Sequence, residues 1–387
     1  LKKITRAPAQ MAQYLTDRQG NVRLATASKD YIYSDLYILD QKSDTWQLNQ
    51  SIAKGMRNLQ PLSFDLSGDN ILALASKQGE PEGLYKINLA SGESQLLSQH
   101  DHVSPSRVWI DDTNKEVFAV EYEAGYPTYE FINQDSAMTA RLKALLAYFP
   151  NQQVRIVSSS KNNKASIVAV FSDTNPAEFY LFDAEKNKIS FLAKAFAEIT
   201  PEQMNTVLPI NYKTRDGLTI YGYLTLPKGK ETKNLPLVVM PHGGPHGPRD
   251  YWGFDTTAQL LANRGMAVLQ VNFRGSGGFG SNFEAAGYQK WGAEIQFDIL
   301  DGVQHLISQG TVNKDNMCMM GASFGGYSAL QSAILAPNLF KCAIGVVGVY
   351  DLPLMFKEGD IAENRSGINY LTAVLGQDTQ QLQAFSP

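Results

Sequence analysis

The sequence predicts a chain of two unlike parts: a partial all-β propeller of about four blades, followed by an α/β domain with a mostly parallel sheet. Three observations lead to this fold class. Short strands repeat through the first half, strands and helices alternate through the second half, and a glycine-flanked serine follows one of the later strands. The first two concern the fold, and the third indicates a site of chemistry.

The repeat in the first half is marked by two residue types in step with each other. Four short alternating strands each centre on a tyrosine, with spacings of 48, 44 and 51 residues: Tyr37, Tyr85, Tyr129 and Tyr180. The strand before each carries an alanine, with spacings of 48, 46 and 50 residues: Ala25, Ala73, Ala119 and Ala169. Units of about 40–50 residues are typical of propeller blades, which stack because one blade cannot cover both its faces. A β-sandwich stays the alternative, and an amphipathic helix at 136–148 is expected to interrupt the third unit.

From about residue 207 the pattern changes to an alternation of strands and helices. Strands are predicted at 208–212, 218–226, 235–240, 266–273, 317–320 and 342–349, and helices at 256–263, 295–308 and 325–335. Such alternation favours a mostly parallel sheet with helices on both faces. We therefore expect a partial propeller over residues 1–200 and an α/β domain over residues 201–387. The chain starts at Leu1 rather than Met and stops at Pro387, so we expect truncation at both ends and an incomplete second domain.

The composition excludes several classes of protein. The 387 residues carry 34 basic and 38 acidic side chains without basic blocks, which argues against nucleic acid or an anionic membrane as a partner. No apolar run approaches about 18 residues, so no membrane span is predicted. Cys318 and Cys342 are too few for a disulfide scaffold or a four-cysteine zinc site, and both are expected to be small core residues. No metal-ligand spacing occurs, so no metal is expected.

The strongest chemical motif is Gly-Ala-Ser-Phe-Gly at residues 321–325, which fits the G-x-S-x-G pattern of a nucleophile elbow. A serine on a tight turn between a strand and a helix is exposed above the sheet in strained backbone angles. Flanking glycines relieve its clash with the helix. The apolar strand before the pentapeptide and the helix after it are the context that the motif requires. We therefore predict that Ser323 is a catalytic nucleophile.

A second motif, Pro-His-Gly-Gly-Pro at residues 241–245, directly follows a buried strand. Acyl transfer through a serine needs two N–H donors for the oxyanion, one from the residue after the nucleophile and one from such a loop. The predicted donors are the backbone amides of Phe324 and Gly243. His242 is expected to shape the loop rather than act as base, because triads on this kind of fold run serine, acid, histidine. For His246 a solvated loop position is favoured.

The glycine loop at residues 275–280 fits the G-x-G-x-x-G pattern of dinucleotide binding. Two features argue against that role: no apolar helix follows the loop, and the loop does not lie in the first strand–helix unit of its domain. No cofactor is therefore expected. Four aromatic residues could line a substrate pocket or belong to the core, and the sequence leaves this open: Trp252, Phe254, Phe279 and Tyr350.

The motifs of the second half together resemble the prolyl oligopeptidase family. The matching pieces are 241–245, Asn-Phe-Arg-Gly-Ser at 272–276, the elbow with Gly326 and Tyr327, and Trp291-Gly292 followed by Asp298 and Asp301-Gly302-Val303. The sequence is most similar to acylaminoacyl-peptidase and dipeptidyl-peptidase-like bacterial members. The resemblance implies a propeller joined to an α/β-hydrolase domain, and a serine peptidase that acts on short peptides. It also implies that the propeller limits access to the site.

The acid and the histidine of a triad should follow the nucleophile in chain order. All five histidines precede Ser323: His100, His102, His242, His246 and His305. In the family the two groups lie on later loops, so Asp351, at the correct edge of the sheet, is expected to shape the pocket instead. Without a triad histidine, only the roughly 10³–10⁴-fold contribution of the oxyanion hole and binding is left. The chain as given is therefore expected to be nearly inactive.

The leading prediction is part of a serine peptidase that forms an acyl-enzyme on Ser323. The oligopeptidase, acylaminoacyl-peptidase and dipeptidyl-peptidase types stay open. An esterase or thioesterase is the first alternative, because the same site cleaves esters. A binding protein with a catalytically dead hydrolase domain is the second. A peptide is the expected partner, a homo-oligomer is left open, and the compartment is either cytoplasmic or periplasmic.

Overall fold

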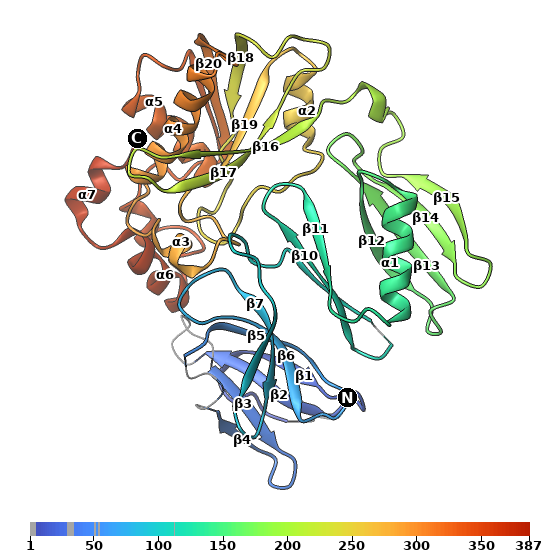
Figure 1. The fold of residues 1–387 in the computed structure, drawn as a ribbon. Coiled ribbons are helices and arrows are strands. Elements are labelled where there is room, and N and C mark those ends of the chain that lie inside the picture. Colours follow the sequence, from blue (N-terminus) through green and yellow to red (C-terminus); the bar gives the residue numbers. More distant parts are fainter. Residues whose placement is uncertain (1–4, 29–34, 50–51, 53–54, 112) are drawn as a thin grey trace.

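The computed structural model describes residues 5–28, 35–49, 52, 55–111 and 113–387 as four small antiparallel sheets followed by one six-stranded mixed sheet (Figure 1). In Figure 1 the small sheets run from the blue ones at the bottom to the green one at the right, around the base of the yellow and orange domain. This arrangement confirms the predicted order of a propeller part and an α/β part.

Each small sheet is a meander whose strands pair in chain order, as expected of a blade. The first has β1 (Gln10–Thr16), β2 (Val22–Ser28), β3 (Asp35–Asp40) and β4 (Thr45–Leu48). The second has β5 (Arg57–Phe64), β6 (Asn70–Ser76), β7 (Gly83–Asn88) and β8 (Ser94–Ser98). The third has β9 (Arg107–Ile110), β10 (Val117–Glu123) and β11 (Pro127–Phe131). The fourth has β12 (Gln153–Ser159), β13 (Ala165–Phe171), β14 (Glu178–Asp183) and β15 (Lys188–Lys194).

The repeating alanines and tyrosines lie on the second and third strands of each blade. In the first two blades they are direct cross-strand partners, because Ala25 pairs with Tyr37 and Ala73 pairs with Tyr85. A small residue opposite a large one lets the ring lie over the neighbouring strand. In the third blade the register differs, and Tyr129 pairs with Glu121 instead.

The helix expected in the third unit is α1 (Ala137–Tyr148), which follows β11 where a fourth strand would otherwise come. Ser136 caps it by accepting a hydrogen bond from the N–H of Met138. Its buried face includes Leu142 and Leu145, which pack against the third and fourth blades. The helix therefore fills the space between these two blades.

The mixed sheet has the strand order β16-β17-β19-β18-β20-β21. Its strands are β16 (Val207–Lys213), β17 (Thr219–Thr225), β18 (Leu235–Val239), β19 (Ala267–Asn272), β20 (Val312–Ala322) and β21 (Cys342–Val346). The pairs from β19 to β21 are parallel, whereas β16, β17 and β19 pair antiparallel. The loops that follow β18 and β20 therefore lie at the same edge of the sheet. β20 starts earlier than predicted, because residues 313–316 form a polar extension without an apolar pattern.

Six helices accompany this sheet in the described residues: α2 (Thr256–Ala262), α3 (Ser281–Ala285), α4 (Glu294–Ser308), α5 (Phe324–Leu335), α6 (Arg365–Leu375) and α7 (Thr379–Ala384). Short 3₁₀ turns lie at Pro201–Gln203 and Leu354–Phe356. α2 packs against β17 and β19, α4 against β16 and β20, and α5 against β20 and β21. The sequence did not predict α6 and α7, whose N-termini are capped by the side chains of Asn364 and Asp378.

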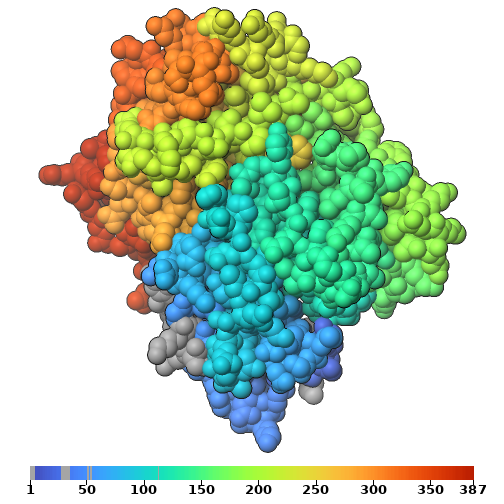
Figure 2. Space-filling model, in the orientation of Figure 1, coloured from blue at the N-terminus to red at the C-terminus, as the bar shows by residue number. Residues whose placement is uncertain are grey.

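Two loops of the α/β domain contact the blades. The glycine loop receives a hydrogen bond from the N–H of Ser104 at the Gly278 carbonyl, 2.9 Å away, and its Phe279 is buried among second- and third-blade residues. In the second loop, the N–H of Trp252 donates to Glu123. On the face shown in Figure 2, blades and α/β domain meet in continuous contact. Trp252 and Phe279 are thus core residues of this interface.

We propose that the boundary between the propeller part and the α/β domain lies at about residue 200, between β15 and β16. Within the described ranges, no helix is long and apolar enough to cross a membrane. The same part of the chain contains no group of three histidine, cysteine or carboxylate side chains arranged to hold a metal ion.

Candidate active site

Ser323 lies on a sharp turn between β20 and α5, in backbone angles that only a constrained residue adopts. Its φ is 56° and its ψ is −123°, and its N–H donates to the Val346 carbonyl at 2.9 Å. A non-glycine residue in this region is strained. Side chains at Gly321 and Gly325 would overlap the Gly325 and Pro241 carbonyls, so both motif glycines are needed for the turn to close. Ser323 itself is exposed.

The two predicted oxyanion donors flank Ser323. A β-carbon added at Gly243 would lie 3.6 Å from the Ser323 β-carbon, so the loop after β18 passes directly beside the nucleophile. Phe324 is the first residue of α5, and the first N–H groups of a helix have no intrahelical acceptor. A free N–H at a helix start also carries part of the positive end of the helix dipole. This geometry fits an oxyanion hole made by Gly243 and Phe324, which stays a prediction.

His242 shapes the loop, as its chain position suggested. Its Nδ1 lies 2.7 Å from the Gly243 carbonyl, its Nε2 lies 2.8 Å from Ser276 Oγ, and its ring stacks on Phe273. Burial lowers the pKa of His242 to about 4, so the ring is neutral at pH 7. Because both nitrogens have partners, neither is free to take a proton from Ser323.

His246 corrects the prediction of a solvated loop position. It is 9% exposed, its Nε2 accepts a hydrogen bond from Trp291 Nε1 at 3.0 Å, and it meets Tyr288 edge to face. Burial lowers the pKa of His246 to about 4. No local pattern predicts this buried position, because Trp291 is 45 residues away along the chain.

No histidine or carboxylate among the described residues makes a hydrogen bond with the Ser323 hydroxyl. Both ring nitrogens of His242 and Nε2 of His246 have other partners. Asp351 is exposed and accepts a hydrogen bond from the N–H of Leu354 at 2.9 Å. It therefore caps the following turn, and the role in shaping the pocket that the sequence favoured stays a prediction.

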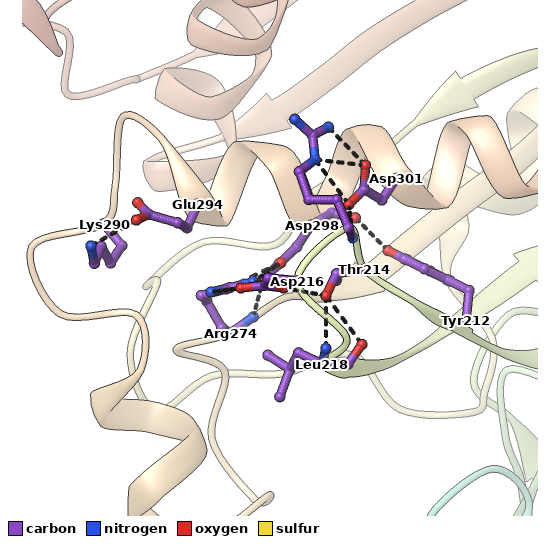
Figure 3. Close-up of polar contacts among 10 residues, drawn as sticks. Tyr212, Thr214, Asp216, Leu218, Arg274, Lys290, Glu294, Asp298 and Asp301 are labelled. Atoms are coloured by element: carbon purple, nitrogen blue, oxygen red, sulfur yellow. Dashed lines mark hydrogen bonds and ion pairs between the residues drawn. The ribbon is translucent and has the colours of Figure 1, made fainter.

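A buried ion pair fixes the loop after β19 behind the site (Figure 3). Arg274 donates to both carboxylate oxygens of Asp298 at 2.7–3.1 Å, and its Nη1 lies 2.8 Å from Asp216. The Asp298 side chain is fully buried on α4. Ser276 lies two residues further along the loop and forms a hydrogen bond with His242. Because His242 lies next to Gly243, the ion pair supports the loop that carries Gly243. This explains the motif residues Arg274 and Asp298, whose pairing the sequence did not reveal.

The glycine loop owes its composition to close packing of backbone on backbone. A β-carbon at Gly277 would overlap the Gly247 carbonyl, and one at Gly287 would lie 2.7 Å from the Gly275 α-carbon. At Gly280 it would lie 2.6 Å from the Glu80 carbonyl carbon of the second blade. The glycines of this loop are therefore required by its close contacts with the Gly247 segment and with the second blade.

The two cysteines form a disulfide, and Cys342 is exposed, which corrects the prediction that both are small core residues. Cys318 and Cys342 are register partners on the parallel strands β20 and β21, and their α-carbons are 4.7 Å apart. Five residues after Cys318 comes Ser323, so the bond ties together the two strands that support the elbow.

Reduction of this disulfide is expected to lower the free energy of unfolding by about 2–4 kcal/mol, because the cross-link restricts the unfolded chain over a separation of 24 residues. Urea unfolding with and without a thiol reductant measures the change. The double variant Cys318→Ser, Cys342→Ser is the control, since the reductant should not alter its stability. A wild-type stability that is the same in both conditions would contradict the assignment.

A strained serine at the carboxyl end of a parallel strand, with a glycine-containing loop beside it, has the geometry that is typical of the nucleophile elbow in α/β-hydrolases. Residues 252–386 match the model of the prolyl oligopeptidase family. The chain is 30% identical over 352 residues to dipeptidyl aminopeptidase BIII of Pseudoxanthomonas mexicana, across 89% of this chain and 50% of that protein. It is 30% identical over 314 residues to dipeptidyl peptidase family member 6 of Caenorhabditis elegans, across 76% of this chain and 42% of that protein.

Solved structures show the same fold at lower identity. A puromycin hydrolase superposes with a TM-score of 0.73 at 16% identity, covering 99% of this chain and 59% of that one. A prolyl endopeptidase superposes with a TM-score of 0.72 at 16% identity, covering 97% and 54%. The chain belongs to the prolyl oligopeptidase family and combines propeller blades with an α/β-hydrolase domain. It spans about half the length of the curated relatives it matches.

Proposed function

We propose that this chain is part of a serine peptidase that hydrolyses short peptides through an acyl-enzyme on Ser323. The observation that carries the proposal is the strained, exposed position of Ser323 beside the Gly243 loop. In the reaction, the Ser323 hydroxyl oxygen attacks the scissile carbonyl carbon and loses its proton to a general base. The Gly243 and Phe324 N–H groups donate to the carbonyl oxygen as it becomes an oxyanion, and the amine then leaves with a proton.

The proposal requires a base that none of the chain's five histidines provides. Burial keeps His242 and His246 neutral, both ring nitrogens of His242 and Nε2 of His246 have partners, and the other three histidines lie in the propeller part and on α4. On this account, the 387 residues by themselves hydrolyse peptides very slowly. The rate left is the roughly 10³–10⁴-fold contribution of oxyanion stabilisation and binding over water.

The type of peptidase is a finer part of the proposal. Both relatives described above are named as dipeptidyl peptidases, which favours cleavage near one end of a short peptide. The blades contact the α/β domain through the glycine loop, so a folded protein substrate would meet them before reaching Ser323. An esterase or thioesterase would use the same nucleophile and oxyanion hole. A non-catalytic binding protein would have no need of the strained elbow.

Covalent labelling with a fluorophosphonate tests the proposal, in a form of the protein that spans the whole length of its relatives. Label is expected on Ser323, located by peptide mass spectrometry, and it should be absent from Ser323→Ala. The control Ser308→Ala, at the exposed end of α4, should label normally. A panel of short peptides and esters then separates peptidase from esterase. A folded protein that does not label would favour the non-catalytic alternative.

A further inference from the structure

A row of polar residues crosses the third blade on the face toward the fourth blade. Arg107 on β9 pairs with Glu121 on β10, and Glu121 pairs with Tyr129 on β11. Directly paired residues share one face of a sheet, so the three side chains lie next to each other. Arg155, on β12 of the fourth blade, completes the group, since its charge acts on Glu121, Tyr129 and Arg107. These four residues are called the Arg107 cluster below.

The Arg107 cluster has hydrogen-bonding groups that the described residues leave unsatisfied. Glu121 is 1% exposed, and its Oε2 accepts a bond from Trp109 Nε1 at 3.2 Å, but its Oε1 has no partner. The Tyr129 hydroxyl and the Nε atoms of Arg107 and Arg155 are likewise buried without partners. Buried polar groups in folded proteins are almost always paired, so four such atoms in one place indicate a missing partner.

The charges around the cluster favour an anion as this partner. Arg249, from the α/β domain, donates to the backbone carbonyl of Glu123 at 2.7 Å, two residues along β10 from Glu121. Three guanidiniums therefore face two carboxylates. The Glu123 carboxylate is already satisfied, because it accepts hydrogen bonds from the Trp252 N–H and the Tyr223 hydroxyl. Burial raises the pKa of Glu123 to about 7, which leaves it partly neutral and increases the positive excess.

The blade that carries the cluster contacts the loop beside Ser323. The loop with Gly243 continues to Arg249, which donates to the Glu123 carbonyl of β10 at 2.7 Å. The Arg249 guanidinium also lies 4.5 Å from the centre of the Tyr251 ring. Glu121 of the Arg107 cluster is two residues from Glu123 on the same strand, so the cluster lies close to the end of β10 that meets this loop.

We propose that Arg107 and Arg155 bind the C-terminal carboxylate of the peptide substrate, while Glu121 accepts a hydrogen bond from the last amide N–H. This inference rests on the proposed peptidase function and specifies its substrates as peptides with a free C-terminus. Guanidinium groups suit carboxylates because their donors match the two oxygens in geometry and charge. The last residue of a peptide has both groups that the cluster requires. Its carboxylate oxygens accept hydrogen bonds from the arginines, and its amide N–H donates to Glu121.

A cavity beside the cluster fits the side chain of the same terminal residue. It has a volume of about 210 Å³ and is bordered by Arg107, by the polar residues Ser159 and Asn163, and by apolar neighbours, among them Trp109, Phe118, Met138 and Ile156. Sites for drug-sized ligands are typically about 300–1,000 Å³, so this cavity is of a size for one side chain.

The test compares two peptides that differ only at the C-terminus: N-acetyl-Ala-Ala-Phe with a free carboxylate and the same peptide as its carboxamide. Binding is measured by calorimetry in the full-length form carrying Ser323→Ala, which prevents turnover. The peptide with the free carboxylate is expected to bind at least about tenfold more tightly than the carboxamide, because a pair of charge-assisted hydrogen bonds contributes at least that much to the affinity. Arg107→Met and Arg155→Met should each abolish this preference. Arg23→Met is the control, because Arg23 lies on β2 and pairs with Asp17, and it should keep the preference.

Equal affinities of the two peptides in the Ser323→Ala form without any arginine substitution would overturn the proposal, and this comparison does not depend on how the arginine variants fold. A second result would also overturn the proposal: the carboxamide peptide binds more tightly when its amino terminus is free than when it is acetylated. Glu121 would then bind an ammonium group rather than an amide N–H. Labelling of Ser323 tests the proposed function separately. A carboxylate preference without labelling would remove the peptidase proposal alone, and labelling without that preference would remove the carboxylate site alone.

Discussion

Replacing Ser323 with alanine is expected to lower kcat for peptide hydrolysis by a factor of about 10³ to 10⁶, in a form of the protein that spans the length of its relatives. The variant loses the atom that attacks the carbonyl carbon. It keeps the Gly243 and Phe324 N–H groups, so a small residual rate and a nearly unchanged KM are expected. Steady-state kinetics on one peptide substrate, with purified wild type and variant side by side, measure both parameters.

The matched control for this prediction is Ser308→Ala. Ser308 ends α4 on the surface, where its hydroxyl donates to the His305 carbonyl at 2.7 Å, away from the elbow. Its kcat should stay within about twofold of wild type, since exposed substitutions outside a site have small effects. A Ser323→Ala variant that keeps more than a tenth of the wild-type kcat would contradict an acyl-enzyme on this residue.

Replacing Asp298 with alanine is expected to lower the free energy of unfolding by about 3–5 kcal/mol, because the Arg274 guanidinium then stays buried without its main partner. Arg274 is 8% exposed, and Asp298 supplies three of its side-chain hydrogen bonds and accepts its backbone N–H as well. Asp216 alone cannot replace them, since it reaches the guanidinium from the partly exposed side. Urea unfolding monitored by tryptophan fluorescence gives the change.

An exposed ion pair nearby provides the comparison for Asp298→Ala. Lys290 and Glu294 lie four residues apart, 44% and 33% exposed, with 2.7 Å between Nζ and Oε1 (Figure 3). Glu294→Ala should cost less than about 1 kcal/mol, as is typical of solvated pairs. Similar costs for the two variants would mean that Arg274 finds another partner or that water enters its site.

The parts of the fold that were predictable depend on local patterns. The spacing of Tyr37 and Tyr85 marks the blades because a strand repeats its alternation wherever the same unit recurs. The glycines around Ser323 predict the elbow because the G-x-S-x-G pattern lies within five residues of chain, although the contact that requires Gly325 is with the distant Pro241 carbonyl. Helix α1 was visible for the same reason, as its apolar face follows the period of a helix.

The features that were missed all depend on which distant segments become neighbours. Cys318 and Cys342 form a bond only because β20 and β21 pair in that register. His246 is buried because a loop brings Trp291 to its ring. The glycine loop matched a cofactor pattern, whereas its glycines are required by contact with Gly247 and with the second blade. None of these contacts leaves a local signal, since each side chain alone would suit several environments.

The central claim is that Ser323 is the nucleophile and that the amides of Gly243 and Phe324 form the oxyanion hole. A crystal structure of the full-length protein after reaction with a fluorophosphonate tests it most directly. The account predicts phosphorus bonded to Ser323 Oγ, with the phosphoryl oxygen about 2.7–3.1 Å from the backbone nitrogens of both Gly243 and Phe324. An adduct on another residue, or a phosphoryl oxygen more than about 3.5 Å from both nitrogens, would contradict it.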